Sequence, residues 1–316
     1  DEKVAQNGWE DDVTRRNGAI DRLLGLAKEE PEAASRIARM LSVYVKELSR
    51  EYPAKIPPST DDLLVLKAWA ENLVIARSDM QNAVQVLGKL RAESGKPLDE
   101  GEIDLSGVNL QGFNLEYLNF EGVLFSKAEM QGANLMHSNL QRASLDDANL
   151  QGSLFLFAKL QRADFYGTNL RGADLSHTNM REASFHNLNL SEVDFKHARM
   201  QRASIEDANL QNANLSHVNL QGAFLVRLKI DSASSFTGAD FRGAMVKRVD
   251  FTKTQIHQKQ FQSMFGDTST VLNSRHEPTD SDRPAHWSKE DLDIDEFHTQ
   301  WHAFQRSIGQ NPNNPK

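Results

Sequence analysis

An apolar residue occurs at every fifth position from Leu105 to Ile230, at 26 consecutive sites without an exception. Two residues before most of these sites stands a small residue, such as Ala128 or Ala148, and a polar residue separates the two. This alternation is typical of a strand, but it restarts after five residues, so each strand must be short and end in a turn. A helix with 3.6 residues per turn would spread these side chains around all its faces. The pattern therefore predicts a β-solenoid that turns a corner every five residues, with the apolar side chains inside.

The repeated units resemble the A(D/N)LXX consensus of pentapeptide repeat proteins. The resemblance is carried by Ala133-Asn134-Leu135, Ala148-Asn149-Leu150, Ala163-Asp164-Phe165 and Ala173-Asp174-Leu175. It covers about residues 103–256 and implies a right-handed quadrilateral β-helix of four units per coil, hence about eight coils. Side chains twenty residues apart then form columns, and one interior column is expected to consist of Leu150, Leu170, Leu190 and Leu210. The register slips by one residue at Ser232–Ser235, which we interpret as a bulge or a loosened corner.

The regions on either side of the repeats have helical spacing, so three parts are expected: an α-helical N-terminal domain (1–100), the β-helix (101–256) and C-terminal capping helices with a tail (257–316). In the first part, Pro31 suits a helix start, and a further helical stretch is expected from Thr60 to Leu90. Bulky residues replace alanine in the first units, which predicts that this end packs against the N-terminal domain. These residues are Ile103, Val108, Phe113, Leu118 and Val123. The N-terminal helices are read as a cap of the solenoid, with a HEAT-like partner-binding module as the alternative.

The C-terminal part contains an amphipathic segment over 258–265 and helical spacing over 289–308. The second segment is expected to pack on the solenoid, and the alternative is that it mediates dimerisation. Residues 309–316 are expected to be disordered.

The segments around Asn17-Gly18, Met40-Leu41 and Ser78-Asp79, placed before the repeats, look like those of bacterial pentapeptide repeat proteins whose N-terminus carries transmembrane helices. No segment here has the 18 or more apolar residues that a membrane span requires. We therefore expect a bacterial, soluble domain, cytoplasmic or membrane-associated, that begins at Asp1 as a fragment of a membrane-tethered protein.

The composition excludes several classes of function. The chain has no cysteine, so thiolate metal sites, disulfides and cysteine nucleophiles are absent. Its net charge is −8, and residues 103–256 contain 16 acidic and 15 basic residues. No region has the basic excess of a nucleic-acid binder. Pentapeptide proteins that mimic DNA and protect gyrase need a strongly acidic rod, and this near-neutral solenoid disfavours that alternative.

Two surface columns are candidate binding sites. The first contains an aromatic ring at each of six positions: Tyr117, His137, Phe157, His177, His197 and His217. Neighbouring imidazoles such as those of His177, His197 and His217 could share a metal ion or respond to pH, although no carboxylate or thiolate completes a ligand set, and a stacked, exposed ladder is the simpler interpretation. The second column contains charged residues that could bind an acidic partner or phosphates: Arg142, Arg162, Glu182 and Arg202. Solvated side chains and amide ladders on a β-face are the simpler interpretation of this column.

Two further columns are expected to be structural. One supplies corners with positive φ: Gly112, Gly132, Gly152 and Gly172. The other is expected to hydrogen-bond the turn backbone: Asn149, Asn169, Asn189 and Asn209.

The sequence contains no phosphate loop, nucleophile elbow, metalloprotease helix or dinucleotide fingerprint. The acidic pairs Asp146-Asp147 and Glu206-Asp207 have no cleft predicted around them. We expect no cofactor and no enzymatic activity. The sequence predicts a protein interaction scaffold whose protein partner it does not identify, with gyrase interaction and metal binding at the histidine column as alternatives.

Overall fold

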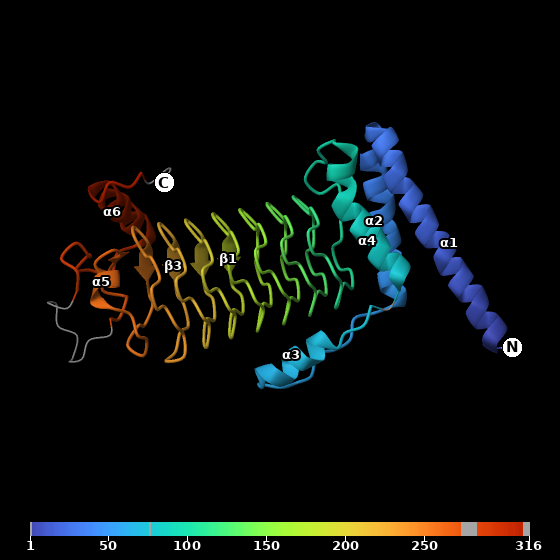
Figure 1. Cartoon of the computed structure of the whole chain (residues 1–316). Coiled ribbons are helices and arrows are strands. Elements are labelled where there is room, and N and C mark those ends of the chain that lie inside the picture. Colours follow the sequence, from blue (N-terminus) through green and yellow to red (C-terminus); the bar gives the residue numbers. More distant parts are fainter. Residues whose placement is uncertain (1, 76, 273–282, 312–316) are drawn as a thin grey trace.

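The computed structural model describes residues 2–75, 77–272 and 283–311, with side chains from residue 12 onward. Its central part is a parallel β-helix, with helices at both ends (Figure 1). Each coil is joined to the next by backbone hydrogen bonds, such as Leu150 N–H to Asn169 O (2.8 Å) and Leu170 N–H to Asn189 O (3.1 Å). One side contains the regular strands of a five-stranded parallel sheet in chain order. These strands are β1 (Ser184–His186), β2 (Ser204–Glu206), β3 (Phe224–Val226), β4 (Met245–Lys247) and β5 (Phe265–Gly266).

Most corners of the coil have one residue in the left-handed region of φ. At the corner after Phe125, Lys127 has φ 60° and Ala128 N–H donates to Phe125 O (3.0 Å). A left-handed residue at the third position is the signature of a type II turn, which favours glycine there. Glycine occupies many corners, but 18 of the described left-handed residues are not glycine. The hydrogen bonds between coils hold these residues in a conformation that costs about 1–2 kcal/mol each.

The interior is filled by the residues of the fivefold repeat. Leu150, Leu170, Leu190 and Leu210 are fully buried, one above another. Each buried leucine stabilises the fold by about 1.5–3 kcal/mol. Bridged residues are 20 apart up to Asn209 and Lys229, and 21 apart from Asn214 and Ser235 to Val226 and Lys247. The extra residue lies in a corner that Asp231 closes by accepting hydrogen bonds from the backbone N–H of Ala233 and Ser234.

The N-terminal part contains α1 (Glu2–Glu29), η1 (Pro31–Ala33), α2 (Ala34–Glu51), α3 (Leu63–Glu71) and α4 (Ser78–Ser94). The single stretch expected from Thr60 to Leu90 is therefore two helices. The chain is extended at Arg77 (φ −145°), where the buried guanidinium donates to the buried Asp79 carboxylate. Tyr44 Oη also donates to Asp79 (2.6 Å), and burial, followed by this contact, raises the pKa of Tyr44 to about 12. The break between the two helices therefore places an ion pair inside the helical unit.

Helices α2 and α4 cover the open edge of the first coil. The backbone N–H groups there have no preceding coil to bond. Asn109 N–H donates to Ser49 Oγ (2.8 Å), Asn114 N–H to Gln81 Oε1 (3.2 Å) and Asn119 N–H to Gly88 O (2.9 Å). The bulky residues of the first units are buried in the same cluster as the apolar residues of α4. An unpaired strand edge invites association with other chains, and these helices prevent it.

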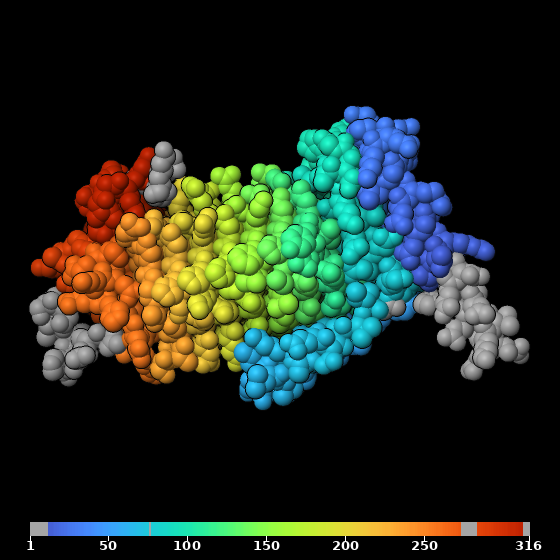
Figure 2. All heavy atoms as spheres, viewed as in Figure 1, coloured from blue at the N-terminus to red at the C-terminus, as the bar shows by residue number. Residues whose placement is uncertain are grey.

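Helix α3 leaves the helical unit and lies along the side of the β-helix (Figures 1 and 2). It lies over the glycine column, where Ala70 contacts Gly132 and Gly152. Arg171 fixes its start by donating to the carbonyls of Thr60 (2.7 Å) and Asp61 (2.6 Å). The glycines therefore provide both left-handed corners and space for a helix.

The C-terminal part contains α5 (Gln258–Phe261) and α6 (Ile294–Ser307). The helix expected over 258–265 is only four residues long, because the chain joins the sheet as β5. Trp287 lies over Gly266 at the end of the sheet and donates from Nε1 to Met264 O (2.9 Å). The segment expected over 289–308 becomes helical at Ile294, since the Asp293 side chain accepts from the first helical N–H groups.

Helix α6 packs its aromatic side chains on the outer face of the sheet, and Trp301 Nε1 donates to Gly243 O (2.8 Å). Residues 312–316 of the tail expected to be disordered lie outside the described residues. Across the described ranges, no helix is both long enough and apolar enough for a transmembrane span.

Candidate interaction site

The aromatic column is a continuous stack of exposed rings. Centroid distances are 4.8 Å from Tyr117 to His137, 4.9 Å from His177 to His197 and 5.1 Å from His197 to His217. All six members occupy left-handed corners. Stacking at about 5 Å matches the separation of neighbouring coils, so the ladder follows directly from the backbone.

The ladder brings ring faces together. Partial desolvation, followed by the charges of His177 and His217, lowers the pKa of the exposed His197. In the part of the chain that the structure describes, no group of three or more His, Asp or Glu side chains converges as a metal site requires. The ladder is therefore suited to stabilising the corners, and its geometry does not favour a shared metal ion.

The charged column is neutralised by carboxylates. Arg162 Nε lies 2.8 Å from Glu182, and Arg202 lies 3.3 Å from the same carboxylate. Arg142 pairs with Glu100 (2.7 Å) and with Glu121. The hydrogen bond from Arg162, followed by the charges of Arg162 and Arg202, lowers the pKa of Glu182 against the opposing effect of burial. These arginines are committed to internal ion pairs, which makes the column a poor match for phosphates.

The two acidic pairs do not form a catalytic arrangement. Burial, followed by the charge of Asp164, raises the pKa of Asp146. At the other pair, the hydrogen bond from Arg227 lowers the pKa of Asp207. Of these four carboxylates, Glu206 lines the groove described below.

The asparagine column contacts the turns. Asn169, Asn189 and Asn209 each accept from a backbone N–H two residues later, at 3.0–3.2 Å. At Asn149, by contrast, the side-chain oxygen is buried without a hydrogen-bond partner.

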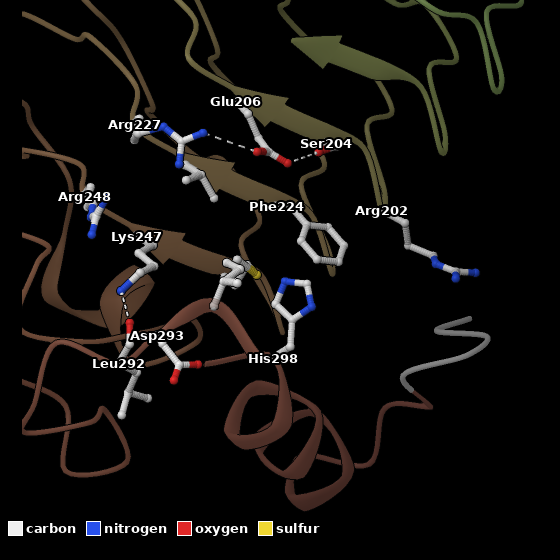
Figure 3. A pocket seen from close by; sticks show the side chains of 13 residues that line it. Arg202, Ser204, Glu206, Phe224, Arg227, Lys247, Arg248, Leu292, Asp293 and His298 are labelled. Carbon is white, nitrogen blue, oxygen red and sulfur yellow. Dashed lines mark hydrogen bonds and ion pairs between the residues drawn. The ribbon is translucent and has the colours of Figure 1, made fainter. Parts of the chain in front are cut away.

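A groove of about 540 Å³ lies where α6 stops covering the sheet (Figure 3). Its floor consists of outward-facing residues of β3 and β4, namely Phe224, Val226 and Met245. Helix α6 contributes Ile294 and His298, and the His298 ring meets the edge of Phe224 at 5.5 Å. The outward positions change from serine on β1 and β2 to Phe224 and Met245 on β3 and β4, which is why the apolar surface begins here.

Cationic side chains line the groove above this apolar floor. Arg227 and Arg248 occupy the same corner in two neighbouring coils, directly after β3 and β4 (Figure 3). Arg202 lies at the opposite edge of the groove, at the corner before β2. Arg227 is held by Asp207 (2.6 Å). The exposed guanidinium of Arg248 has no ion pair with any residue that the structure describes.

A buried lysine fixes the loop beside the groove. Lys247 Nζ donates to Asp267 (2.5 Å), Asp291 (2.7 Å) and the Leu292 carbonyl (2.7 Å). The hydrogen bond from Lys247, with a smaller contribution from Arg248, lowers the pKa of Asp291. This network places Leu292, and with it the start of α6, against the sheet, so the groove is held in shape by buried hydrogen bonds.

The repeat itself is shared with known proteins. A family model described as pentapeptide repeats matches the chain in eight copies, over residues 103–142, 138–176, 158–196, 168–207, 189–227 and 208–252. The chain belongs to the pentapeptide repeat family. Membership confirms the resemblance found in the consensus units, and it implies that the coil is right-handed and quadrilateral. A comparison with curated proteins found no match.

Solved structures of other pentapeptide repeat proteins are also similar. HetL from the cyanobacterium Nostoc sp. strain PCC 7120, involved in heterocyst differentiation regulation, is 20% identical over 58% of this chain and 88% of its own, with a TM-score of 0.27. Full-length QnrB1, a plasmid-mediated fluoroquinolone resistance protein, is 15% identical over 57% and 91%, with a TM-score of 0.24. A pentapeptide repeat protein from the thylakoid lumen of Arabidopsis thaliana is 22% identical over 54% and 85%, with a TM-score of 0.15.

Sequence reasoning missed the groove of this pentapeptide repeat protein. A signal was present, because apolar Phe224, Val226 and Met245 stand at outward positions that are polar in most other units. Outward apolar residues indicate a covering element, here α6. The position at which that cover ends depends on the loop before Ile294, and no local pattern in the sequence specifies it.

Proposed function

We propose that this pentapeptide repeat protein is a non-enzymatic scaffold that binds another protein. The single observation that supports it is the groove beside α6, which combines an apolar floor with the cation of Arg248, a side chain without an ion pair among the described residues. Grooves of this kind are typical of recognition sites, because apolar contacts supply affinity and a few polar groups supply specificity. The near-neutral solenoid favours this function over mimicry of DNA.

The ends of the rod also belong to this proposal. We propose about eight coils, closed by the N-terminal helices at one end and by the segment with α5 and Trp287 at the other, with α6 packed on the face of the sheet. The aromatic face of α6 packs against the sheet, while Thr299, Gln300 and Arg306 are exposed. This polar outer face supports a capping role for α6 over dimerisation through it. Attachment to a membrane would require segments other than the helices described.

Site-specific photocrosslinking in the source cell tests the scaffold. We would place p-benzoylphenylalanine at Ile294 in the groove and, as a matched control, at the exposed Lys196 outside it. A defined adduct with one protein at Ile294 and none at Lys196 is the expected result. Equal or absent adducts at several surface positions would contradict the scaffold. A gyrase supercoiling assay tests the DNA-mimic alternative. That alternative predicts that this chain inhibits the supercoiling activity of gyrase.

A further inference from the structure

The groove beside α6 has a chemistry that selects among partners. Its apolar part is partly open, since Ile294 is 49% exposed and Phe224 is only partly buried. Because Met245 and Val226 are buried beneath them, a side chain entering here would meet a continuous apolar surface. Covering such a surface contributes about 25 cal/mol per Å².

The charge at the rim limits what can lie over this floor. Arg248 offers a guanidinium with no ion pair among the described residues, next to Arg227, whose charge Asp207 and Glu206 neutralise. A guanidinium of this kind binds a carboxylate in a two-pronged geometry. Arg248 can therefore bind one anionic group of a ligand at this corner.

The surroundings of the groove disfavour a long polyanion. Exposed carboxylates stand at the start of α6, at Asp293, Asp295 and Glu296, and Asp291 lies beside Lys247. A nucleic acid extending from Arg248 in this direction would bring its phosphates close to these groups, and like charges repel. A single carboxylate bound at Arg248 meets less of this repulsion than a chain of phosphates does, because it carries only one charge.

We propose that this groove binds a short segment of a partner protein in which an Asp or Glu stands next to a large apolar residue. The inference rests on the proposed scaffold function and specifies the chemistry of its partner. The carboxylate of the segment contacts Arg248, and the apolar side chain covers Phe224 and Ile294. Affinity then depends on both parts together, because neither a lone carboxylate nor a lone apolar group uses the whole groove.

Fluorescence anisotropy on the full chain tests this proposal. The probe is a panel of fluorescein-labelled heptapeptides with a central Glu flanked by Leu, Ile, Phe or Met, with matched panels that carry a central Lys or flanking Ala. Several Glu-and-apolar peptides are expected to bind at least about 10-fold more tightly than both matched panels, which corresponds to about 1.4 kcal/mol. If no Glu-and-apolar peptide exceeds its Lys counterpart, the proposal is wrong.

Variants localise the binding. Arg248→Glu is expected to weaken the best peptide by about 10-fold or more and to improve its Lys counterpart, while Ile294→Ala weakens it without this charge inversion. Arg199→Glu is the control, since Arg199 is an exposed arginine of the same solenoid, without a described ion pair and outside the groove. Circular dichroism checks that each variant is folded. Unchanged binding to Arg248→Glu would overturn the assignment.

Two further outcomes separate the two proposals. Tighter binding of a labelled single-stranded oligonucleotide than of any peptide, lost in Arg248→Glu, would overturn the peptide assignment. A photocrosslinked partner that persists in Arg248→Glu would show that the scaffold exists and that this groove is not where it reads a carboxylate. Loss of the crosslink in Arg248→Glu, with retention in Arg199→Glu, supports both.

Discussion

The carbonyl oxygen of Ala70 occupies the space beside Gly132 so closely that a β-carbon on this glycine would lie 2.5 Å from it. Real β-carbons do not approach an oxygen so closely. Gly132 also has φ 64°, a conformation that strains residues with side chains. The glycine is therefore required twice, once by its own corner and once by α3.

Substitution can separate these two requirements. Gly132→Ala is expected to lower the free energy of unfolding by more than Gly107→Ala, because Gly107 has a similar φ of 68° and nothing within 4 Å of the added methyl group. The corner alone costs about 1–2 kcal/mol. Hydrogen exchange should increase over residues 60–72 only in Gly132→Ala. Equal destabilisation and equal exchange in the two variants would show that α3 tolerates the methyl group.

The edge of the first coil provides a second prediction. Gln81 accepts from Asn114 N–H and donates to Asn114 O (2.7 Å), so Gln81→Ala leaves both backbone groups to water. We expect a loss of about 1 kcal/mol in stability and increased self-association by sedimentation velocity, since the edge is uncovered. Gln201→Ala is the control, because its side chain makes no described hydrogen bond. Identical sedimentation of the two variants would contradict a protective role for Gln81.

The interior column supports a third prediction. Leu190→Ala removes a fully buried side chain, and chemical denaturation should show a loss of about 2–5 kcal/mol. Leu154→Ala changes the same residue type on the same solenoid, where the side chain is 40% exposed, and should cost much less. A similar cost at both positions would mean that the fivefold repeat does not form the core.

The histidine ladder predicts a dependence of stability on pH. The pKa of His197 is lowered in the folded state, so the unfolded chain takes up the proton first as the pH falls. Stability is then complete above the ordinary value of about 6.5 and declines as the pH falls through 6.5 towards the folded pKa. His197→Phe keeps a ring in the stack and removes the titration. Urea unfolding between about pH 5 and 8 should therefore decline less steeply in this variant. An unchanged slope would assign the pH dependence to other groups.

The sequence was sufficient for the repeat because burial there is local and periodic. Each unit places its large residue inside regardless of what flanks the array, so a fivefold spacing around Leu150 or Leu190 determines the coil by itself. The corner chemistry was less predictable. His137 and Arg142 stand in left-handed corners although neither is glycine, because hydrogen bonds between coils override the local preference.

Contacts between distant segments could not be predicted in the same way. The glycine column was interpreted from φ alone, and its second role depends on where a helix some sixty residues earlier in the chain comes to lie. The break before Arg77 likewise follows from a buried partner, Asp79, that helical spacing does not reveal. Such features arise from packing between elements, about which one-dimensional periodicity contains no information.

Arg171 gives the array a long-range coupling that stacked repeats ordinarily lack. In a simple solenoid each coil senses only its neighbours, so fraying can spread inward one coil at a time. Here the guanidinium joins the loop before α3 to Glu192, while the other end of that helix returns to the helical unit. Opening any coil between these two anchor points also strains α3 and the loop before it. The first part of the rod should consequently melt as one cooperative block, and the coils beyond Glu192 retain the freedom to open singly.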